Sequence, residues 1–335
     1  MLRNNVMALI DLPHNTFRPF NNAKCVAILL QKNRPQQPTI EMVVAEEMGH
    51  NHQGKPIFRY DSDSHTISDE IWDDLAVAGL ELSGERERHF TFLVDSERVQ
   101  QEDIFIPRYY WPPLVHDLEP PSERDIEWKT LHDLIDAGAV TKSAGHGSPP
   151  AEYKGKGGYP YIRVKDIINW EIYRDPTALI PKSEFDKLTA RFPLEFEDVV
   201  YVSRGSYRIG DVAIVGPDDC DVALTREIQV LRVNRLNEIG LTPYYLLYLL
   251  STKVVAQQTR ARVFMDTTLP NISDRYLNIE LPWDRDINIR MEISERVREV
   301  LEAKWHAMSR IRELRSEIHF DSGQELPVAE HGEIT

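Results

Sequence analysis

The stretch VSRGSYRIG, residues 202–210, gathers side chains that can bind nucleic acid around a single glycine. An arginine guanidinium can donate two hydrogen bonds to the major-groove edge of a guanine, and serine or tyrosine hydroxyls commonly contact phosphate oxygens. Gly205 permits a tight turn that would hold these side chains outward. A β-hairpin with solvated arginines is the alternative interpretation. The candidate DNA-binding residues of this turn are Ser203, Arg204, Ser206, Tyr207 and Arg208.

Two further segments combine positive charge with polar or aromatic side chains. YKGKGGYPYIRVK, residues 153–165, lacks the GxxxxGK[ST] frame of a nucleotide-binding P-loop. TRARVFMDTTLPN, residues 259–271, adds two arginines. Each segment fits a loop on the DNA backbone as well as a plain surface loop. The candidate DNA-binding residues here are Lys154, Lys156, Arg163, Lys165, Arg260, Arg262, Thr268 and Asn271.

Other residues that could hold a metal ion or cut DNA do not form a recognisable site. GHNHQG, residues 49–54, places its histidines and asparagine side by side, whereas the nuclease motif of that name spreads them over a ββα unit that holds a metal. A PD-(D/E)xK nuclease pattern fails because residues 227–229 read Glu-Ile-Gln and lack the lysine. We therefore expect no metal site and no catalytic residue in this chain.

Charge and composition narrow the class of protein further. The formal net charge of -15 argues against nonspecific binding to polyanions, which depends on neutralisation of phosphates by lysine and arginine. Residues 122–282 contain 20 basic and 23 acidic side chains, so this part of the chain should repel DNA least. Cys25 and Cys220 form neither a disulfide framework nor a metal clip, and no apolar run approaches the roughly 18 residues of a membrane span. We expect a cytoplasmic protein without a membrane contact.

The first third of the chain predicts strands, then a helix, then an irregular boundary. NVMALIDLP (5–13) and AKCVAILLQK (23–32) predict strands, the second of them buried on both faces because its apolar run is unbroken. SDEIWDDLAVAGLEL predicts a helix with Ser68 as its N-cap. Five prolines between residues 107 and 121 predict an irregular segment at a domain boundary.

The rest of the chain predicts a mixed domain and a long helix. IEWKTLHDLI (126–135) predicts a short strand that leads into a helix, and a helix over 242–263 should begin with Thr242 as N-cap and Pro243 at its first position. From Ile289 to Ile318 apolar residues recur at steps of three and four, which predicts a helix of roughly 32 residues, about 48 Å long at 1.5 Å per residue. Its length favours a coiled coil or helix pair over packing on its own domain alone.

These elements together predict an α+β protein. Its expected parts are a β-rich fragment over 1–60, a helix and a proline-rich linker over 61–125, a mixed α/β domain over 126–283, a long amphipathic helix over 284–320, and a flexible tail over 321–335.

The first of these parts resembles the C-terminal tail of the adenine-N6 DNA methyltransferases of restriction–modification systems. The matching residues are Leu12, Pro13, Phe17, Lys32, Gly49, Gly54 and Lys55, and the sequence departs from the family at residues 21–24. The resemblance implies that Phe17 or Phe20 helps to wall the pocket of a flipped adenine; the alternative is a strand end capped by buried aromatics. The family's cofactor loop and (D/N)PP(Y/F) tetrapeptide are absent, and SPPA at 148–151 is no substitute. The resemblance therefore places S-adenosylmethionine on a partner chain, with none bound to this one.

Residues 126–320 resemble the target-recognition domain and conserved helix of a type I restriction–modification specificity subunit. The segments that carry this resemblance are WKTLHDLI, YPYIRVKDI, FEDVVYVSRGSYRIGDVAIV, REIQVLRVN, TPYYLLYLLST, TTLPNIS and LNIELPW. The resemblance implies double-stranded DNA as ligand, a methyltransferase subunit as partner, and a restriction subunit as a further one. The helical stripe adds a homodimer through residues 286–319.

Three hypotheses follow. The preferred one is a DNA-recognition component that acts with a separate catalytic chain. The second is the C-terminal fragment of a fused methyltransferase–specificity enzyme whose core lies upstream, and the third is a protein-interaction module that uses the acidic first third. Under the first two, the chain by itself should not methylate DNA.

Overall fold

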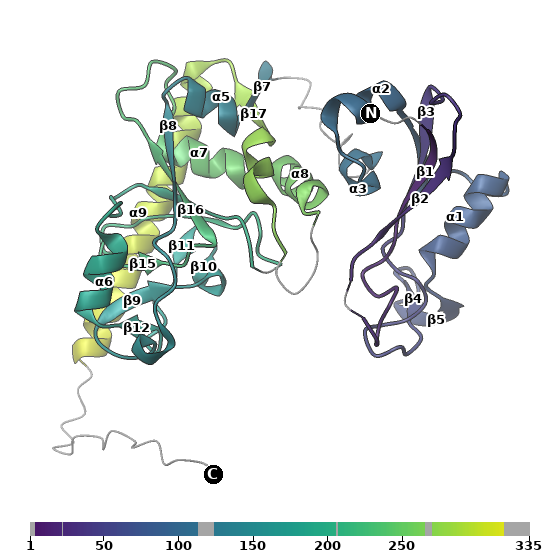
Figure 1. The fold of residues 1–335 in the computed structure, drawn as a ribbon. Coiled ribbons are helices and arrows are strands. Elements are labelled where there is room, and N and C mark those ends of the chain that lie inside the picture. The colour runs from purple at the N-terminus through teal and green to yellow at the C-terminus, as the bar shows by residue number, and fades with distance from the viewer. Residues whose placement is uncertain (1–3, 22, 113–123, 206, 265–269, 318–335) are drawn as a thin grey trace, which may run out of the picture.

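The computed structural model describes residues 4–21, 23–112, 124–205, 207–264 and 270–317. Helices and strands alternate irregularly, and the predicted α+β class is confirmed. Figure 1 shows two units, residues 4–112 and residues 124–317, each with its own sheet. Among the described residues, no helix is long and apolar enough to cross a membrane.

The first unit is built on a four-stranded sheet in the order β2-β1-β3-β6. Its strands are β1 (Asn5–Asp11), β2 (Val26–Gln31), β3 (Thr39–Val44) and β6 (Thr91–Asp95), and β1 runs parallel to β3. One face packs on α2 (Ser96–Glu102) and α3 (Pro107–Tyr110) through a core that includes Leu9, Met42 and Val99. Helix α1 (Asp74–Ser83) lies on the other side of the sheet (Figure 1).

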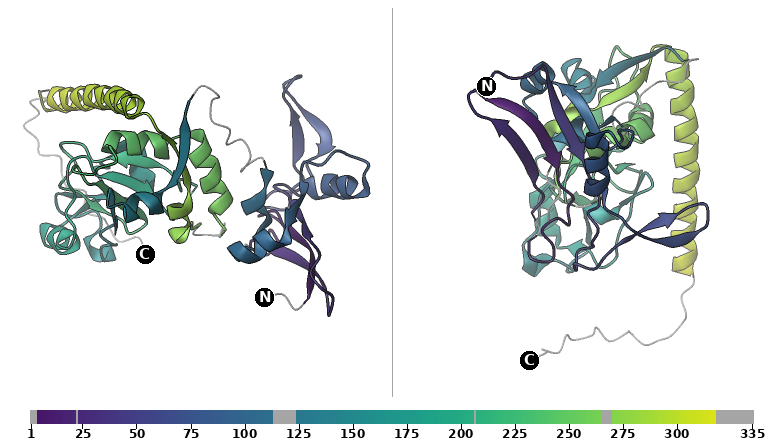
Figure 2. Two further views of the ribbon diagram at one scale, coloured as in Figure 1. Left: turned by 90° about the horizontal axis from the view of Figure 1, so that it is seen from above. Right: turned by 90° about the vertical axis from the view of Figure 1, so that its right-hand side faces the viewer.

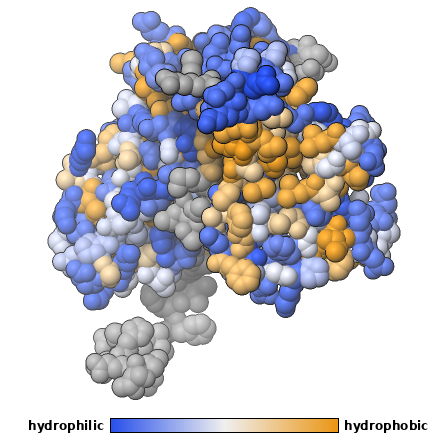
Figure 3. All heavy atoms as spheres, turned by 45° about the vertical axis from the view of Figure 1, so that its right-hand side comes forward, coloured by the Kyte–Doolittle hydropathy of each residue, from blue (hydrophilic) through white to orange (hydrophobic). Residues whose placement is uncertain are grey.

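Strand β2 is not buried on both faces, so that prediction is wrong. Within the described part of the chain it pairs only with β1 and forms the edge of the sheet. Ile28, Leu29 and Leu30 are 51%, 45% and 57% exposed, respectively, because no described element covers this end of the sheet on either face. Figure 3 shows hydrophobic side chains gathered on this unit, which lies on the right of that view. Strand β2 therefore has one edge without a hydrogen-bonded neighbour in the described structure. Its two faces are both apolar and exposed.

The helix predicted from Ser68 begins later. Residues Thr66–Ile71 form β5, which pairs with β4 (Phe58–Asp61), and the side chain of Asp73 caps α1 by accepting from the Ala76 N–H at 3.1 Å. Ile71 pairs with Phe58 across the hairpin, so the residues before Asp73 are extended where the sequence predicted a helix. Since the β4–β5 hairpin and β6 belong to the first unit, this unit runs across the predicted division at residue 60.

The proline-rich stretch is regular at its start. Residues Pro107–Tyr110 form α3, with proline in the first turn, where its missing N–H costs no helical hydrogen bond. The prediction of an irregular segment is therefore wrong for 107–110, and residues 113–121 lie outside the described residues.

The second unit has a central antiparallel sheet in the order β14-β13-β16-β8. The strands are β8 (Val140–Ala144), β13 (Val199–Val202), β14 (Val212–Ile214) and β16 (Ile228–Val233). On β13, Val199 and Tyr201 face one core and Val200 and Val202 face another, because successive side chains of a strand point to opposite faces. Helices cover the first core, and the small strands of the unit cover the second.

Smaller elements surround this sheet. They are β9 (Tyr159–Ile162), β12 (Leu179–Ile180) and β15 (Ala223–Leu224) in one sheet, the pair β10 (Ile167–Ile168) and β11 (Glu171–Ile172), and α6 (Lys182–Thr189). The predicted strand and helix after Ile126 are confirmed as β7 (Ile126–Thr130) and α5 (Leu131–Asp136), and β7 pairs with β17 (Glu280–Asp284). A capping box between Thr130 and Asp133 begins α5.

The helix predicted over 242–263 consists of two helices. Helix α7 (Pro243–Leu250) begins as predicted, with the Thr242 hydroxyl accepting from the Tyr245 N–H at 3.0 Å. It ends at Ser251, whose hydroxyl donates to the Leu247 carbonyl, and α8 (Lys253–Arg262) follows.

The long terminal helix is confirmed as α9 (Ile287–Glu317). Figure 2 shows it running along the outside of the second unit. Val297 and Leu301 of the predicted stripe are buried in the first core, whereas Ile311 and Leu314 are 42% and 43% exposed, respectively. The predicted stripe therefore packs on its own unit in the first half of the helix and turns to the surface in the second.

Candidate nucleic-acid interface

The turn after β13 meets the segment before the short 3-10 helix over Ser273–Asn278. The Ile272 N–H donates to the Ser203 carbonyl at 3.1 Å, and the Gly205 N–H donates to the Pro270 carbonyl at 2.9 Å. Arg204 and Asn271 pair in an antiparallel bridge. Two segments that the sequence suggested separately therefore form one surface.

The end of the third predicted segment, at Val164, and the residues that follow it lie beside the same turn. One Arg208 amino nitrogen donates to the Ile167 carbonyl at 3.2 Å and to the Asp211 carboxylate at 2.9 Å. A Cβ at Gly205 would lie 3.6 Å from the Val164 side chain. Gly205 has φ +105°, which an L side chain rarely adopts, so the glycine holds the turn in the shape that the sequence predicted.

A carboxylate that sequence reasoning did not select organises the arginines of this turn. Glu227 accepts from Arg204 and from Arg226, each at 3.3 Å. Burial alone would raise the pKa of Glu227, but hydrogen bonds from the Thr225 hydroxyl and from Arg226 hold it below its ordinary value. The group is therefore an anion that holds two guanidinium groups side by side.

Glu227 and Arg226 were missed because their position depends on strand pairing. Val202 pairs with Ile228, so the residues just beyond β13 lie opposite those just before β16. The only sequence signal is the Arg-Glu pair directly before the apolar strand over 228–233.

The candidate residues differ in how freely they can reach a ligand. Tyr207 is 90% exposed, and the Arg208 guanidinium lies over its ring at 5.5 Å from the centroid. Lys154, Lys156 and Arg260 are exposed as well. Ser206 and Thr268 lie outside the described residues.

Other candidates are engaged within the protein. Arg163 pairs with Asp166 and Asp175, and these hydrogen bonds raise its pKa. Arg262 donates to the carbonyls of Gln258 and Asn278, and burial lowers its pKa.

Three further candidates differ in accessibility: Ser203 is buried, Asn271 is partly buried and Lys165 is exposed. The Ser203 hydroxyl, 6% exposed as a residue, donates to the Glu227 carbonyl. The Asn271 side-chain oxygen accepts from the Ser273 N–H at 2.6 Å. The Lys165 ammonium lies 3.7 Å from Asp175 but keeps a side chain that is 64% exposed. Among the cations of residues 153–165, Lys165 therefore lies near the Gly205 turn and is still accessible to a ligand.

The two lysines of the glycine-rich loop lie apart from the turn. Lys154 and Lys156 come before β9, and Lys165 comes after it. Four residues of strand span about 13 Å. These lysines can therefore contact a long ligand such as a duplex some distance from the turn.

The aromatic residues of the methyltransferase-like segment are on the surface. Phe20 is 96% exposed and Phe17 is 43% exposed. The alternative of buried aromatics that cap a strand is therefore wrong for Phe20. Among the described residues, no three histidine, cysteine or acidic side chains come together as a metal site.

No family model matches this chain, and no curated protein matches it. Solved structures are similar to it. The S subunit of a type I restriction–modification system from M. genitalium is 15% identical, with a match that covers 60% of this chain and 45% of that one at a TM-score of 0.39. The HsdS subunit from Thermoanaerobacter tengcongensis is 14% identical, with coverage of 64% and 47% and a TM-score of 0.34.

A third solved structure matches over more of this chain. The type IIG restriction endonuclease BpuSI is 12% identical, and the match covers 89% of this chain and 39% of that one at a TM-score of 0.38. The chain thus spans less than half the length of each of these three proteins.

Proposed function

We propose that this chain recognises a specific DNA sequence in a restriction–modification system and acts with a separate methyltransferase chain, which would bind S-adenosylmethionine. The observation that carries the proposal is found at the turn around Gly205. Two predicted DNA-binding segments are joined there by backbone hydrogen bonds, and the end of the third lies beside them at Val164. Such a constellation offers guanidinium, hydroxyl and amide groups on one surface, which is what reading base edges requires.

Arg204 is the best candidate for contact with a base. Its guanidinium is held by Glu227 on one side, so its direction is set before DNA arrives. A guanidinium so oriented loses less conformational freedom when it donates to guanine O6 and N7. Arg208 is tied to Ile167 and Asp211, and we assign it to holding the turn.

Phosphate contacts fall to the exposed cations. Lys154, Lys156 and Lys165 flank β9 on the same unit as the turn. Because a lysine on a phosphate carries no sequence information, these residues would supply register and affinity while Arg204 supplies preference.

The open edge of β2 is the proposed contact with the methyltransferase chain. A strand that is apolar on both faces is typical of the interior of a sheet covered by helices, which a catalytic α/β core would complete. A core in the same polypeptide would cover the edge equally well, so this observation also favours the alternative of a fused enzyme. The nucleotide sequence upstream in the same reading frame distinguishes the two.

Further partners are proposed from α9 and from the resemblance. The exposed residues Val300, Ile311 and Leu314 lie within about 60° of one another around the helix axis, so they form a stripe for a second copy of α9 in a homodimer or coiled coil through residues 286–319. A restriction subunit would join the assembled complex, and the free thiols of Cys25 and Cys220 suit a reducing cytoplasm.

The test is selection of bound duplexes from a random pool. The chain is co-expressed and purified with candidate methyltransferase chains, and the complex is used for selection with and without excess nonspecific DNA. We expect one short motif to be enriched. Recovery of the pool unchanged from a stable, monodisperse complex would reject sequence recognition.

A further inference from the structure

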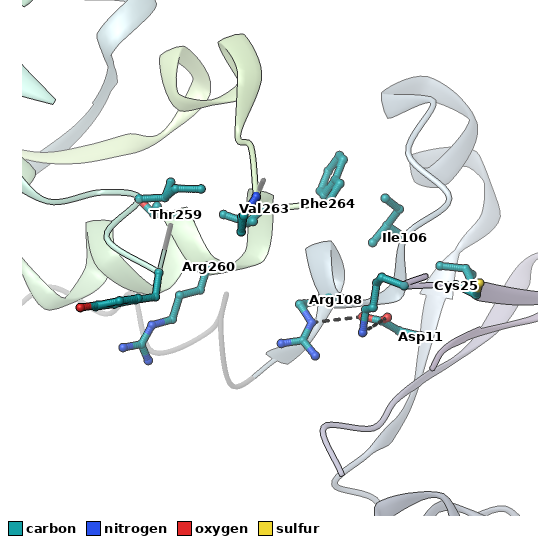
Figure 4. A pocket seen from close by; sticks show the side chains of 13 residues that line it. Asp11, Cys25, Ile106, Arg108, Thr259, Arg260, Val263 and Phe264 are labelled. Carbon is teal, nitrogen blue, oxygen red and sulfur yellow. Dashed lines mark hydrogen bonds and ion pairs between the residues drawn. The ribbon is translucent and has the colours of Figure 1, made fainter. Parts of the chain in front are cut away.

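A pocket of about 320 Å³ lies between the two units. The units touch beside it, where the rings of Tyr109 and Phe264 meet edge to face at 6.0 Å and the Arg262 guanidinium lies over Tyr109. Figure 4 shows Arg108 of α3 on one wall and Arg260 of α8 on the other, with both guanidinium groups turned toward the same side of the pocket. The volume falls within the range of small-molecule sites.

The lining of this pocket is positive in a strongly negative protein. Its described residues include three cations, Lys24, Arg108 and Arg260, and one carboxylate, Asp11. The Asp11 carboxylate is buried and lies 2.7 Å from Lys24 and 3.1 Å from Arg108, so its charge is already compensated. Glu46, which pairs with the other end of Arg108, is half-exposed and is not part of the lining. An anion is therefore the ligand that the charges favour.

Arg260 has the freedom to bind such an anion. Among the residues that the structure describes, no hydrogen bond or ion pair involves its side chain, and the side chain is exposed at the pocket. Tyr207, also in the lining, presents a 90% exposed ring. Guanidinium groups beside an exposed aromatic ring match the two parts of a nucleotide, because a phosphate binds to arginine and a base stacks on a ring.

We infer that the pocket between the units binds a nucleotide, with its phosphate at Arg260 and Arg108 and its base against Tyr207. The inference rests on the proposed function for the source of this nucleotide, which is the backbone of bound DNA. Free mononucleotides share the same chemistry and form a separate arm of the test. With DNA as the source, the strand contacts both units, and the first unit becomes part of the DNA-binding surface.

Cys25 lines the pocket and supplies a local probe. The full chain, with its partner where one is needed for binding, is treated with iodoacetamide, and modification of each cysteine is followed by mass spectrometry. Cys220 lies outside the lining and serves as the internal control. The ligands are the selected duplex, deoxyadenosine monophosphate and inorganic phosphate. At ten times the dissociation constant, the duplex should slow modification of Cys25 about tenfold and leave Cys220 unchanged.

A pair of variants separates this site from the rest of the surface. Arg260→Ala should weaken binding to all duplexes alike and lower the slope of log affinity against log salt by about one. Arg191→Ala removes another exposed arginine of the second unit, outside the pocket, and should change neither quantity.

The outcomes distinguish the pocket from the proposed function. If the duplex binds with its preference intact while Cys25 reacts at the unchanged rate and Arg260→Ala keeps the parent slope, the inference is overturned and sequence recognition stands. If no duplex binds but the mononucleotide protects Cys25, the site stands with a free nucleotide as its ligand and the proposed function fails. If neither ligand protects Cys25, the inference is overturned.

Discussion

Arg204 donates to Glu227 at 3.3 Å across the ends of β13 and β16, and the same carboxylate holds Arg226. Arg204 was predicted from the sequence as a DNA-binding residue, whereas Glu227 comes near it only through the pairing of β13 with β16. If Arg204 reads a guanine, Arg204→Ala should cost about 1–3 kcal/mol on the selected site and little on a scrambled duplex. Titration of both duplexes at fixed salt measures this difference.

Arg208→Ala is the companion variant, because Arg208 is bound to Ile167 and Asp211. This variant should weaken binding to the selected and the scrambled duplex equally, to the extent that it destabilises the folded protein. Equal binding of the two duplexes by the parent and by both variants would remove the recognition role of this turn.

Lys154 tests contact with phosphate. Its side chain is exposed in the loop before β9. Lys154→Ala should weaken binding to all sequences alike and reduce the salt slope by about one, because one fewer counterion is released. Binding is measured between low and physiological salt, with Lys253→Ala on α8 as a lysine control outside the predicted segments. A change in sequence preference without a change in slope would contradict the assignment.

The chain alone should not transfer methyl groups to DNA. Its sequence contains no (D/N)PP(Y/F) tetrapeptide to hold the target adenine. Purified chain is incubated with radiolabelled S-adenosylmethionine and the selected duplex, and then the same reaction is repeated with the methyltransferase partner. Incorporation should require the partner. Labelled DNA from the chain alone, in proportion to its concentration through successive purification steps, would refute this prediction.

His146 should make folding stability depend on pH. Its Nδ1 accepts from the Leu224 N–H at 2.8 Å and its Nε2 donates to the Phe192 carbonyl at 2.9 Å, so the folded protein needs the neutral ring. Burial lowers the pKa of His146 below its ordinary value of 6.5. As the pH falls below about 6.5, the unfolded chain binds the proton first, and the free energy of unfolding decreases by at most about 1.4 kcal/mol per pH unit.

His146→Gln is the matched variant for this measurement, because an amide can donate and accept but does not titrate. Urea unfolding at several pH values between about 7.5 and 5.5 should show a flatter dependence for the variant than for the parent. Parallel curves would show that other groups cause the dependence.

Substitutions on the buried and the exposed face of α9 should affect folding stability and self-association separately. Leu301 is 1% exposed in the core, and Leu301→Ala should cost about 2–5 kcal/mol of unfolding free energy. Val300, next to it in sequence, is 60% exposed, so Val300→Lys should change stability by less than about 0.5 kcal/mol yet weaken self-association through the stripe. Unfolding curves and sedimentation equilibrium report the two effects. Unchanged self-association in Val300→Lys and in Ile311→Lys would reject the homodimer.

Local signals in the sequence were sufficient to predict several elements. Thr242 and Pro243 begin α7, the Thr130–Asp133 box begins α5, and the spacing of apolar residues predicts α9. Each of these signals acts within one or two helical turns, so the residues that cause the structure are neighbours in the chain. The turn at Gly205 was likewise predictable, because glycine readily adopts a positive φ, and Gly205 has φ +105°.

Contacts between distant residues were decided by tertiary structure alone. An unbroken apolar strand reads the same in the middle of a sheet and at its edge, so only the strand order shows that β2 is exposed. The position of Glu227 beside Arg204 depends on the register of β16 against β13, and the bridge from Arg204 to Asn271 joins segments 67 residues apart. The sequence thus determined which side chains could bind DNA, whereas strand pairing decided which of them share a surface, because hydrogen bonds between strands do not depend on distance along the chain.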